Sequence, residues 1–247
     1  MNQMWVVAVI LLGTFVQGLT GFGLALVSVP LLSLMLDVKT AVPLAGLFGW
    51  LITFPLVYRM RAHVQWRTCL IMAVGSLPGS LLGAKLLKIV PARWILVAMG
   101  LVLVLSALHA MRSGHKTDGA GRKSGPLSAL AGFCSGTLGA SVGEPGPPAI
   151  AYASMQAWTA DQVKGSLLFF FMLQMVGAVF GFWHRSLLTE EVFSLFAWGV
   201  PSFAIGLLAG IKAWDVLRTR RINYHAIVHT FLLSIGAYLL VKNLFST

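Results

Sequence analysis

Apolar segments and short polar breaks alternate along the whole chain. A membrane-spanning helix needs roughly 20 mostly apolar residues to cross about 30 Å of hydrocarbon. Several segments reach or approach that length. The pattern predicts helices at residues 4–16, 24–36, 41–58, 68–87, 94–111, 127–138, 147–158, 163–183, 192–211 and 226–241.

Composition supports the same class. The 247 residues are 57% hydrophobic and only 10% charged, and the mean hydropathy is +0.84, whereas a soluble domain carries about 25% charged residues. A soluble core of this length could not hide so much apolar surface. We therefore predict an all-α polytopic membrane protein with the lipid bilayer as its surroundings. The N-terminal segment lacks the basic region of a signal peptide, so we take it as part of the mature fold.

One segment, residues 112–126, is polar, glycine-rich and basic, and is the only clear linker. It divides the chain into two transmembrane repeats, residues 1–111 and 127–247. Each half begins with two short apolar segments joined by a glycine-rich break, and three longer segments follow. The breaks are residues 17–23 and 139–148.

A weak internal similarity supports this division into repeats. When Pro78 is aligned with Pro201, Gly83 aligns with Gly206. Similarity of this strength is what the internal repeats of secondary transporters show.

The distribution of positive charge predicts how the opening pairs sit in the membrane. Thirteen residues of helix rise about 20 Å, so each pair is expected to be a hairpin that enters and leaves on the same side. Twelve of the 18 Lys and Arg residues then share one face, whereas a single broken span would divide them evenly. The twelve lie in the loops 59–67, 112–126, 157–164 and 212–225. Two fully spanning helices per pair would place every loop on the same membrane face as the hairpin does, so that variant stays open.

The hairpin reading implies two inverted repeats, because five segments per half is an odd number. It places linker 112–126 in the cytoplasm and both termini on the periplasmic or extracellular side. We predict the cell inner membrane as the location.

The two breaks are the predicted binding site. Irregular backbone at membrane depth is tolerated only where protein or water covers it, so we expect the breaks to meet in the interior. Helix ends expose free N–H groups that attract anions, and glycine allows close approach to the backbone. The predicted partner is therefore a small anionic substrate. The candidate binding residues are Gln17, Thr20, Gly21, Phe22, Gly23, Glu144, Gly146, Pro147, Pro148, Tyr152 and Lys164.

Each polar candidate has two interpretations. Glu144 is a proton carrier or polar gate, since intramembrane acids are costly and usually functional; otherwise it satisfies nearby backbone groups. Gln17 and Thr20 either donate hydrogen bonds to an oxyanion or cap helices. Lys164 is either a cation for the substrate or an interfacial anchor.

Other chemistry is disfavoured. The net charge of +11 follows from membrane topology, and no basic run interleaved with aromatics indicates nucleic-acid binding. Cys69 and Cys134 suggest neither a disulfide framework nor a metal site, and we expect no metal, cofactor or catalytic residue. Residues 139–143, GASVG, match G-x-S-x-G. An intramembrane serine hydrolase at Ser141 is therefore a remote alternative, although nothing indicates the strand that this motif needs.

Two stretches carry a resemblance to a known family. QGLTGFGLALVSVPLL (17–32) and GEPGPPAIAYASM (143–155) resemble the paired signatures of the sulfite exporter TauE/SafE family of membrane permeases. Many relatives have a glycine-rich turn before the Pro-Pro-x-x-x-Tyr run, and a basic residue, often Arg, where Lys164 stands. Glu144 within that turn is a departure or a subgroup feature.

The resemblance implies transport of small sulfur-containing anions such as sulfite, thiosulfate or organosulfonates. Because the chain has no nucleotide-binding motif, we predict a secondary transporter coupled to protons or another ion. A passive anion channel is the alternative. The anion, the direction of transport, the stoichiometry and homo-oligomerisation stay open.

Overall fold

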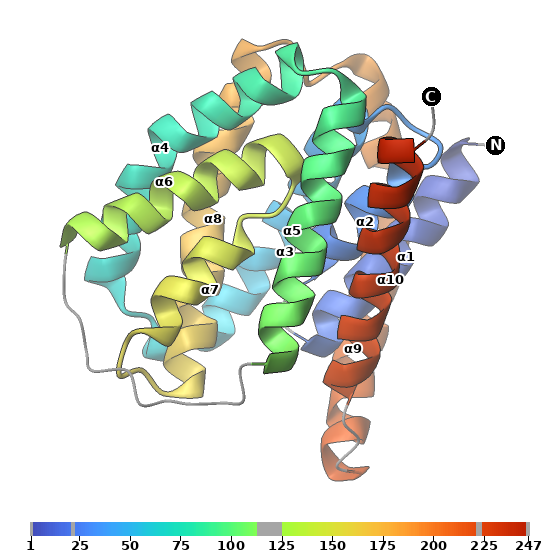
Figure 1. The fold of residues 1–247 in the computed structure, drawn as a ribbon. Coiled ribbons are helices and arrows are strands. Elements are labelled where there is room, and N and C mark those ends of the chain that lie inside the picture. The colour runs from blue at the N-terminus through green and yellow to red at the C-terminus, as the bar shows by residue number, and fades with distance from the viewer. Residues whose placement is uncertain (1, 21–22, 113–124, 221–223, 246–247) are drawn as a thin grey trace. The chain divides into compact units, whose positions relative to one another are not determined.

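The computed structural model describes residues 2–20, 23–112, 125–220 and 224–245, and among these it contains helices and no strand (Figure 1). The helices are α1 (Asn2–Thr20), α2 (Leu24–Leu32), α3 (Val38–Met60), the 3₁₀ helix η1 (Arg61–His63), α4 (Trp66–Ile89), α5 (Ala92–Arg112), α6 (Gly125–Val142), α7 (Gly146–Ser154), α8 (Ala160–His184), α9 (Glu190–Arg220) and α10 (Tyr224–Phe245). The predicted all-α class is confirmed. Most of the predicted linker, residues 113–124, lies outside the described residues.

Four helical stretches of the described chain are long and apolar enough to cross a membrane. They are Val38–His63, Trp66–Ile89, Ala160–His184 and Glu190–Ala213. Large apolar side chains such as Val74, Phe180 and Trp198 are exposed on these helices. Extended exposed apolar surface of this kind marks a surface that contacts membrane or protein, so the helices support the predicted membrane protein.

Each opening pair is a long helix followed by a short one that turns back along it. Trp5 Nε1 on α1 donates a hydrogen bond to the carbonyl oxygen of Leu31 on α2, at 3.0 Å. Ser128 on α6 is hydrogen-bonded to Tyr152 on α7 in the same antiparallel sense, at 2.7 Å. The pairs are therefore hairpins, and a single broken span is excluded. The short arms α2 and α7 have nine residues each, or about 14 Å of helix.

The long arms extend further than the apolar pattern predicted. α1 continues through Gln17 and Gly18, and α6 continues through Gly139 and Ser141, all of which the sequence assigned to the breaks. Glycine allows this because it brings helices into close contact in membranes. Gly18, for example, lies against the α9 backbone at Leu207. Packing at these glycines therefore overrides their low helix propensity.

The described chain forms two compact units that interleave the sequence halves. Unit 1 comprises residues 1–49, 90–112 and 188–247, and unit 2 comprises residues 50–89 and 113–187. In unit 1, α1 packs on α9 and α2, and α5 packs on α10. In unit 2, α4 packs on α6 and α8, and α7 packs on α6 and α8. The compact units therefore do not coincide with the predicted division at linker 112–126. That division stays a prediction about the internal repeat.

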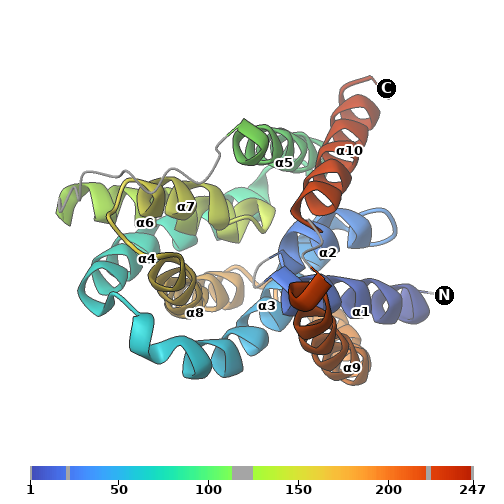
Figure 2. The ribbon, with the colours of Figure 1, turned by 90° about the horizontal axis from the view of Figure 1, so that it is seen from below.

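Helices α4 and α6 lie against each other in unit 2 (Figure 2), and their contact is built on glycine from both helices. A Cβ atom at Gly75, Gly79 or Gly83 of α4 would collide with the α6 backbone. Gly132 and Gly136 of α6 meet the α4 backbone in the same way. The residue numbers of the contacting positions rise together along α4 and α6, so the two helices run parallel to each other. Small residues that let backbones approach are a main source of association between membrane helices.

Candidate functional site

The first break, in unit 1, is a capped helix start. Gly23 precedes α2 with φ of 113°, a left-handed conformation that favours glycine. The buried Gln17 side chain accepts a hydrogen bond from the backbone N–H of Leu24, with Oε1 and N 2.8 Å apart. Gln17 therefore caps α2, as one of its two interpretations predicted. The Thr20 side chain, Gly21 and Phe22 lie outside the described residues.

Removing this cap is expected to lower stability. Gln17→Leu would leave the N–H of Leu24 buried without its acceptor, at a cost of about 1–3 kcal/mol. Thermal unfolding of the purified protein would show a lower melting temperature. The matched control is Gln3→Leu, because Gln3 is an exposed glutamine at the start of the same helix. Equal melting temperatures for the two variants would contradict the capping role.

The second break, in unit 2, reverses the chain over three residues. Gly143 takes a φ of 81°, and the N–H of Glu144 donates to the carbonyl oxygen of Leu138 at 3.3 Å. α7 then begins at Gly146 and carries Pro147 and Pro148 in its first turn. Proline fits there because the first N–H groups of a helix lack intrahelical partners.

The prolines correct one expectation about this helix end. The sequence predicted bare amide groups as the anion-binding feature. Proline has no N–H, so Gly146 supplies the only amide donor among the first three positions of α7. The helix dipole still favours an anion there, but a strong oxyanion site at this end needs a donor from elsewhere.

Glu144 is the acidic side chain of this break and is almost completely enclosed. It is 2% exposed, and its Oε1 atom has no hydrogen-bond partner among the described residues. Burying an ionised carboxylate without a partner is very costly, whereas the neutral acid carries an O–H donor. The environment therefore suits a carboxyl group that is protonated when the site is closed to water.

Gln174 on α8 lies beside the same break. It is 0% exposed, and its Nε2 donates to Ser80 Oγ on α4 at 3.2 Å. This contact is a hydrogen bond between two helices, of the kind that polar residues within apolar membrane segments form. A Cβ at Gly139 would stand 2.9 Å from Pro145 Cβ and 3.0 Å from Gln174 Nε2. The break is thus beside the middle of α8, a candidate membrane span. The sequence had not placed Gln174 in the site.

Tyr152 and Lys164 lie elsewhere in unit 2. The Tyr152 hydroxyl is bonded to Ser128, which precedes Gly139 on α6 by about 16 Å of helix. Lys164 is half-buried in the first turns of α8, where Asp161 and Arg59 are its electrostatic neighbours. The structure therefore brings Glu144, Gly146, Pro147 and Pro148 together, but neither Tyr152 nor Lys164 with them.

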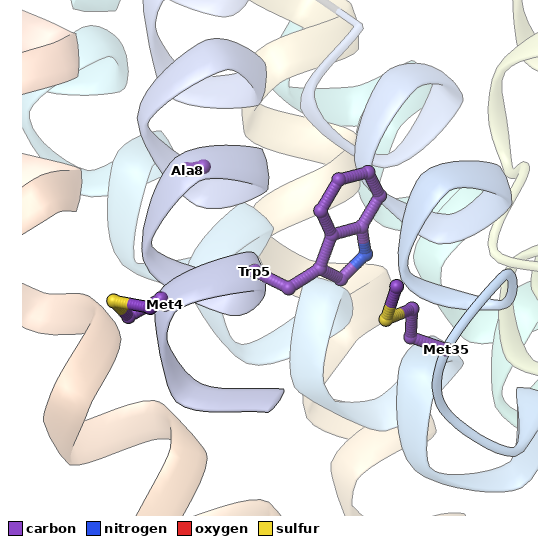
Figure 3. A pocket seen from close by; sticks show the side chains of 4 residues that line it. All are labelled: Met4, Trp5, Ala8 and Met35. Atoms are coloured by element: carbon purple, nitrogen blue, oxygen red, sulfur yellow. The ribbon is translucent and has the colours of Figure 1, made fainter. Parts of the chain in front are cut away.

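A pocket in unit 1 lies away from the break. It has a volume of about 260 Å³ and is lined by Met4, Trp5, Ala8 and Met35 (Figure 3). Three of these residues come from the first turns of α1, at the opposite end of that helix from Gln17. Its lining is apolar and open, which suits a lipid-facing surface better than an anion site.

The other chemistries considered from the sequence find no support. Ser141 lies within helix α6 and donates its hydroxyl to the Thr137 carbonyl oxygen at 2.6 Å. The strand-to-helix turn of a nucleophile elbow is therefore missing at this serine. Cys69 and Cys134 are both free thiols. Among the described residues, no group of three His, Cys, Asp or Glu side chains could hold a metal ion.

Comparison with known proteins gives one match. The model of the family described as "Sulfite exporter TauE/SafE" matches residues 6–239, nearly the whole chain. No curated protein matches the chain, and no solved structure matches it.

Proposed function

The chain belongs to the sulfite exporter TauE/SafE family of membrane transporters, and we propose that it is a proton-coupled carrier of small sulfur-containing anions such as sulfite, thiosulfate or organosulfonates. The observation that carries the proposal is the buried carboxyl group of Glu144, whose Oε1 atom has no partner among the described residues, at a helix break beside the middle of a candidate membrane span. Ionisable groups in such positions mark substrate pathways and proton relays.

The chemistry of the second break favours binding an anion and a proton together. An ionised Glu144 would repel an anion at the start of α7. A protonated Glu144 has no charge and supplies an O–H donor. This donor replaces the backbone N–H donors that Pro147 and Pro148 lack. The dipole of α7 and the Gly146 amide add to that donor. The proton remains on the carboxyl group while the anion is bound, so the two cross together and one negative charge is compensated.

The first break stays a second candidate for substrate binding. Gln17 Oε1 is engaged by Leu24, but a glutamine side chain also carries two N–H donors on Nε2. Gly23 takes a left-handed conformation at the start of α2, which glycine adopts without steric cost. In the proposal, linker 112–126 faces the cytoplasm and the termini face outward, on the distribution of Lys and Arg.

Transport by purified protein in liposomes tests the proposal. We expect saturable uptake of sulfite, thiosulfate or an organosulfonate, stimulated by an imposed pH gradient and showing counterflow. Phosphate and simple carboxylates serve as the comparison panel. Flux that neither saturates nor shows counterflow would indicate a channel, and saturable flux that ignores the pH gradient would remove the proton coupling.

Ligand-induced stabilisation gives an independent measure of substrate class. A ligand that binds only the folded protein stabilises it by about 2.7 kcal/mol at 100 times its dissociation constant. We expect sulfur oxyanions or sulfonates to raise the melting temperature more at low pH than at neutral pH, because binding requires the proton. Equal shifts at all pH values would contradict joint binding of anion and proton.

A further inference from the structure

Unit 2 buries three polar atoms that have no hydrogen-bond partner among the described residues. They are Ser135 Oγ, Glu144 Oε1 and Gln174 Oε1. Buried polar groups are nearly always paired, so each exception calls for a physical explanation. The Glu144 and Gln174 oxygens are especially informative because both residues lie at the same stretch of α6. The backbone N–H of Glu144 donates to Leu138, and Gln174 lies beside the next residue, Gly139.

Gly139 of α6 lies beside Gln174 and beside Pro145, the residue that follows Glu144. A Cβ at this glycine would approach Pro145, which directly follows Glu144, and also Nε2 and Cδ of Gln174. Nε2 of Gln174 is already used by Ser80. The oxygen Oε1 of Gln174 is an acceptor without a partner among the described residues, on a residue that lies beside the break carrying Glu144.

We propose that Gln174 is a positioning residue that holds Glu144 in its protonated form. An ionised carboxylate only accepts hydrogen bonds, so two partnerless acceptors would then share one buried region. A single proton resolves this, because the Glu144 O–H donates to Gln174 Oε1 and gives both groups a partner. The inference rests on the proposed function for its second step, in which an arriving anion takes over the O–H bond and the proton stays on Glu144.

Charged groups on the neighbouring helices do not offer another explanation for the unpaired carboxyl oxygen of Glu144. The titratable side chains on the helices packed around the break are Arg67, Cys69, Lys85 and Lys88 on α4, Cys134 on α6, Tyr152 on α7, and Asp161, Lys164 and His184 on α8. Lys85 and Lys88 belong to the end of α4 that meets α6 near Ser141, but both are exposed, whereas Glu144 is buried. A neutral amide is then a suitable partner for a neutral acid.

Infrared spectroscopy of the protein in liposomes without substrate tests the inference. The carbonyl stretch of the Glu144 acid is assigned by its loss in Glu144→Gln. In Gln174→Met, which keeps an unbranched side chain of similar length, we expect this band to move to higher wavenumber because the acid loses its acceptor. An unmoved band in Gln174→Met would overturn the inference. Gln156→Met is the matched control, because Gln156 is a buried glutamine of the same unit, and it should leave the band in place.

A second measurement uses the unaltered protein and does not depend on the folding of any variant. With glutamine labelled with ¹³C at the side-chain carbonyl, raising the pH to deprotonate Glu144 is expected to shift one amide carbonyl band. Absence of that shift would also overturn the inference. Neither measurement contains an anion, so the two proposals fail separately. Transport with an unmoved acid band refutes the role of Gln174 alone, and a moved band without transport refutes the proposed function alone.

Discussion

Glu144→Gln is expected to uncouple anion movement from the proton gradient while leaving anion binding intact. Glutamine has nearly the shape of the protonated acid, is neutral, and keeps an N–H donor in place of the O–H. The variant should therefore bind the anion and exchange it in counterflow at every pH. Glutamine has no titratable proton to carry across the membrane. Accumulation driven by a pH gradient should therefore fall about tenfold or more, an effect of about 1.4 kcal/mol or more on the transport equilibrium.

Two further variants make the result specific. Glu144→Leu removes the donor as well as the proton, and we expect anion affinity to fall about 10- to 100-fold, because hydrogen bonds to charged groups contribute about 1.5–3 kcal/mol. Glu190→Gln is the control, since Glu190 is an exposed acid at the start of α9 and its loss should change neither binding nor coupling. Proton-driven accumulation by Glu144→Gln at the level of the unaltered protein would exclude Glu144 as the proton carrier.

The helices of this fold were predictable where apolar length alone determines them. The segments predicted at 68–87 and 163–183 correspond to Trp66–Ile89 and Ala160–His184, because a lipid-facing helix must be apolar over its full length. Prediction failed where tertiary contact replaced hydrophobicity as the cause. α6 runs on through Gly139 because this glycine fits against Gln174 and Pro145, and no property of the residues 139–142 by themselves indicates that partner.

The internal repeat gains support from packing, although its inverted form stays a proposal. The aligned glycines Gly83 and Gly206 have corresponding surroundings in their separate units. Gly83 lies against α6 at Thr137, and Gly206 lies against α1 at Thr14. Each therefore packs on the opening helix of the other sequence half. The pairing of α4 with α6 and of α9 with α1 involves elements far apart in sequence, so the alignment alone could not predict it.

The position of the second break was predictable from the sequence, whereas its role as a binding site stays a prediction. Glycines, prolines and an acid within an apolar chain identified the second break, and Glu144 is buried there. The missing parts depended on neighbours in space. Gln17 was equally consistent with capping and with substrate binding until Leu24 N–H was seen to occupy its oxygen. Gln174 lies near the site because α8 passes the break at Gly139. This neighbour could not be predicted from the sequence.

Gly79→Leu is expected to have the largest effect on folding. Gly79 lies in the middle of α4, and a Cβ there would collide with the backbone at Phe133 of α6, which has no side-chain freedom with which to yield. A leucine must separate the two helices, and overpacking costs about 1–3 kcal/mol or more. The separation would also remove the close backbone contact that drives association of membrane helices. Loss of folded, monodisperse protein in detergent, or a melting temperature lowered by several degrees, would be the result.

Gly49→Leu provides the matched comparison, because a Cβ at Gly49 of α3 would meet no atom within 4 Å. Both variants exchange a helical glycine for a good helix former, which by itself favours the helix by about 1 kcal/mol. Any difference between them therefore reports packing and not propensity. Folded yield and melting temperature should be kept in Gly49→Leu and reduced in Gly79→Leu. If both variants melted together, the parallel α4–α6 contact could not be the main support of unit 2, and the position of Glu144 beside α8 would need another cause.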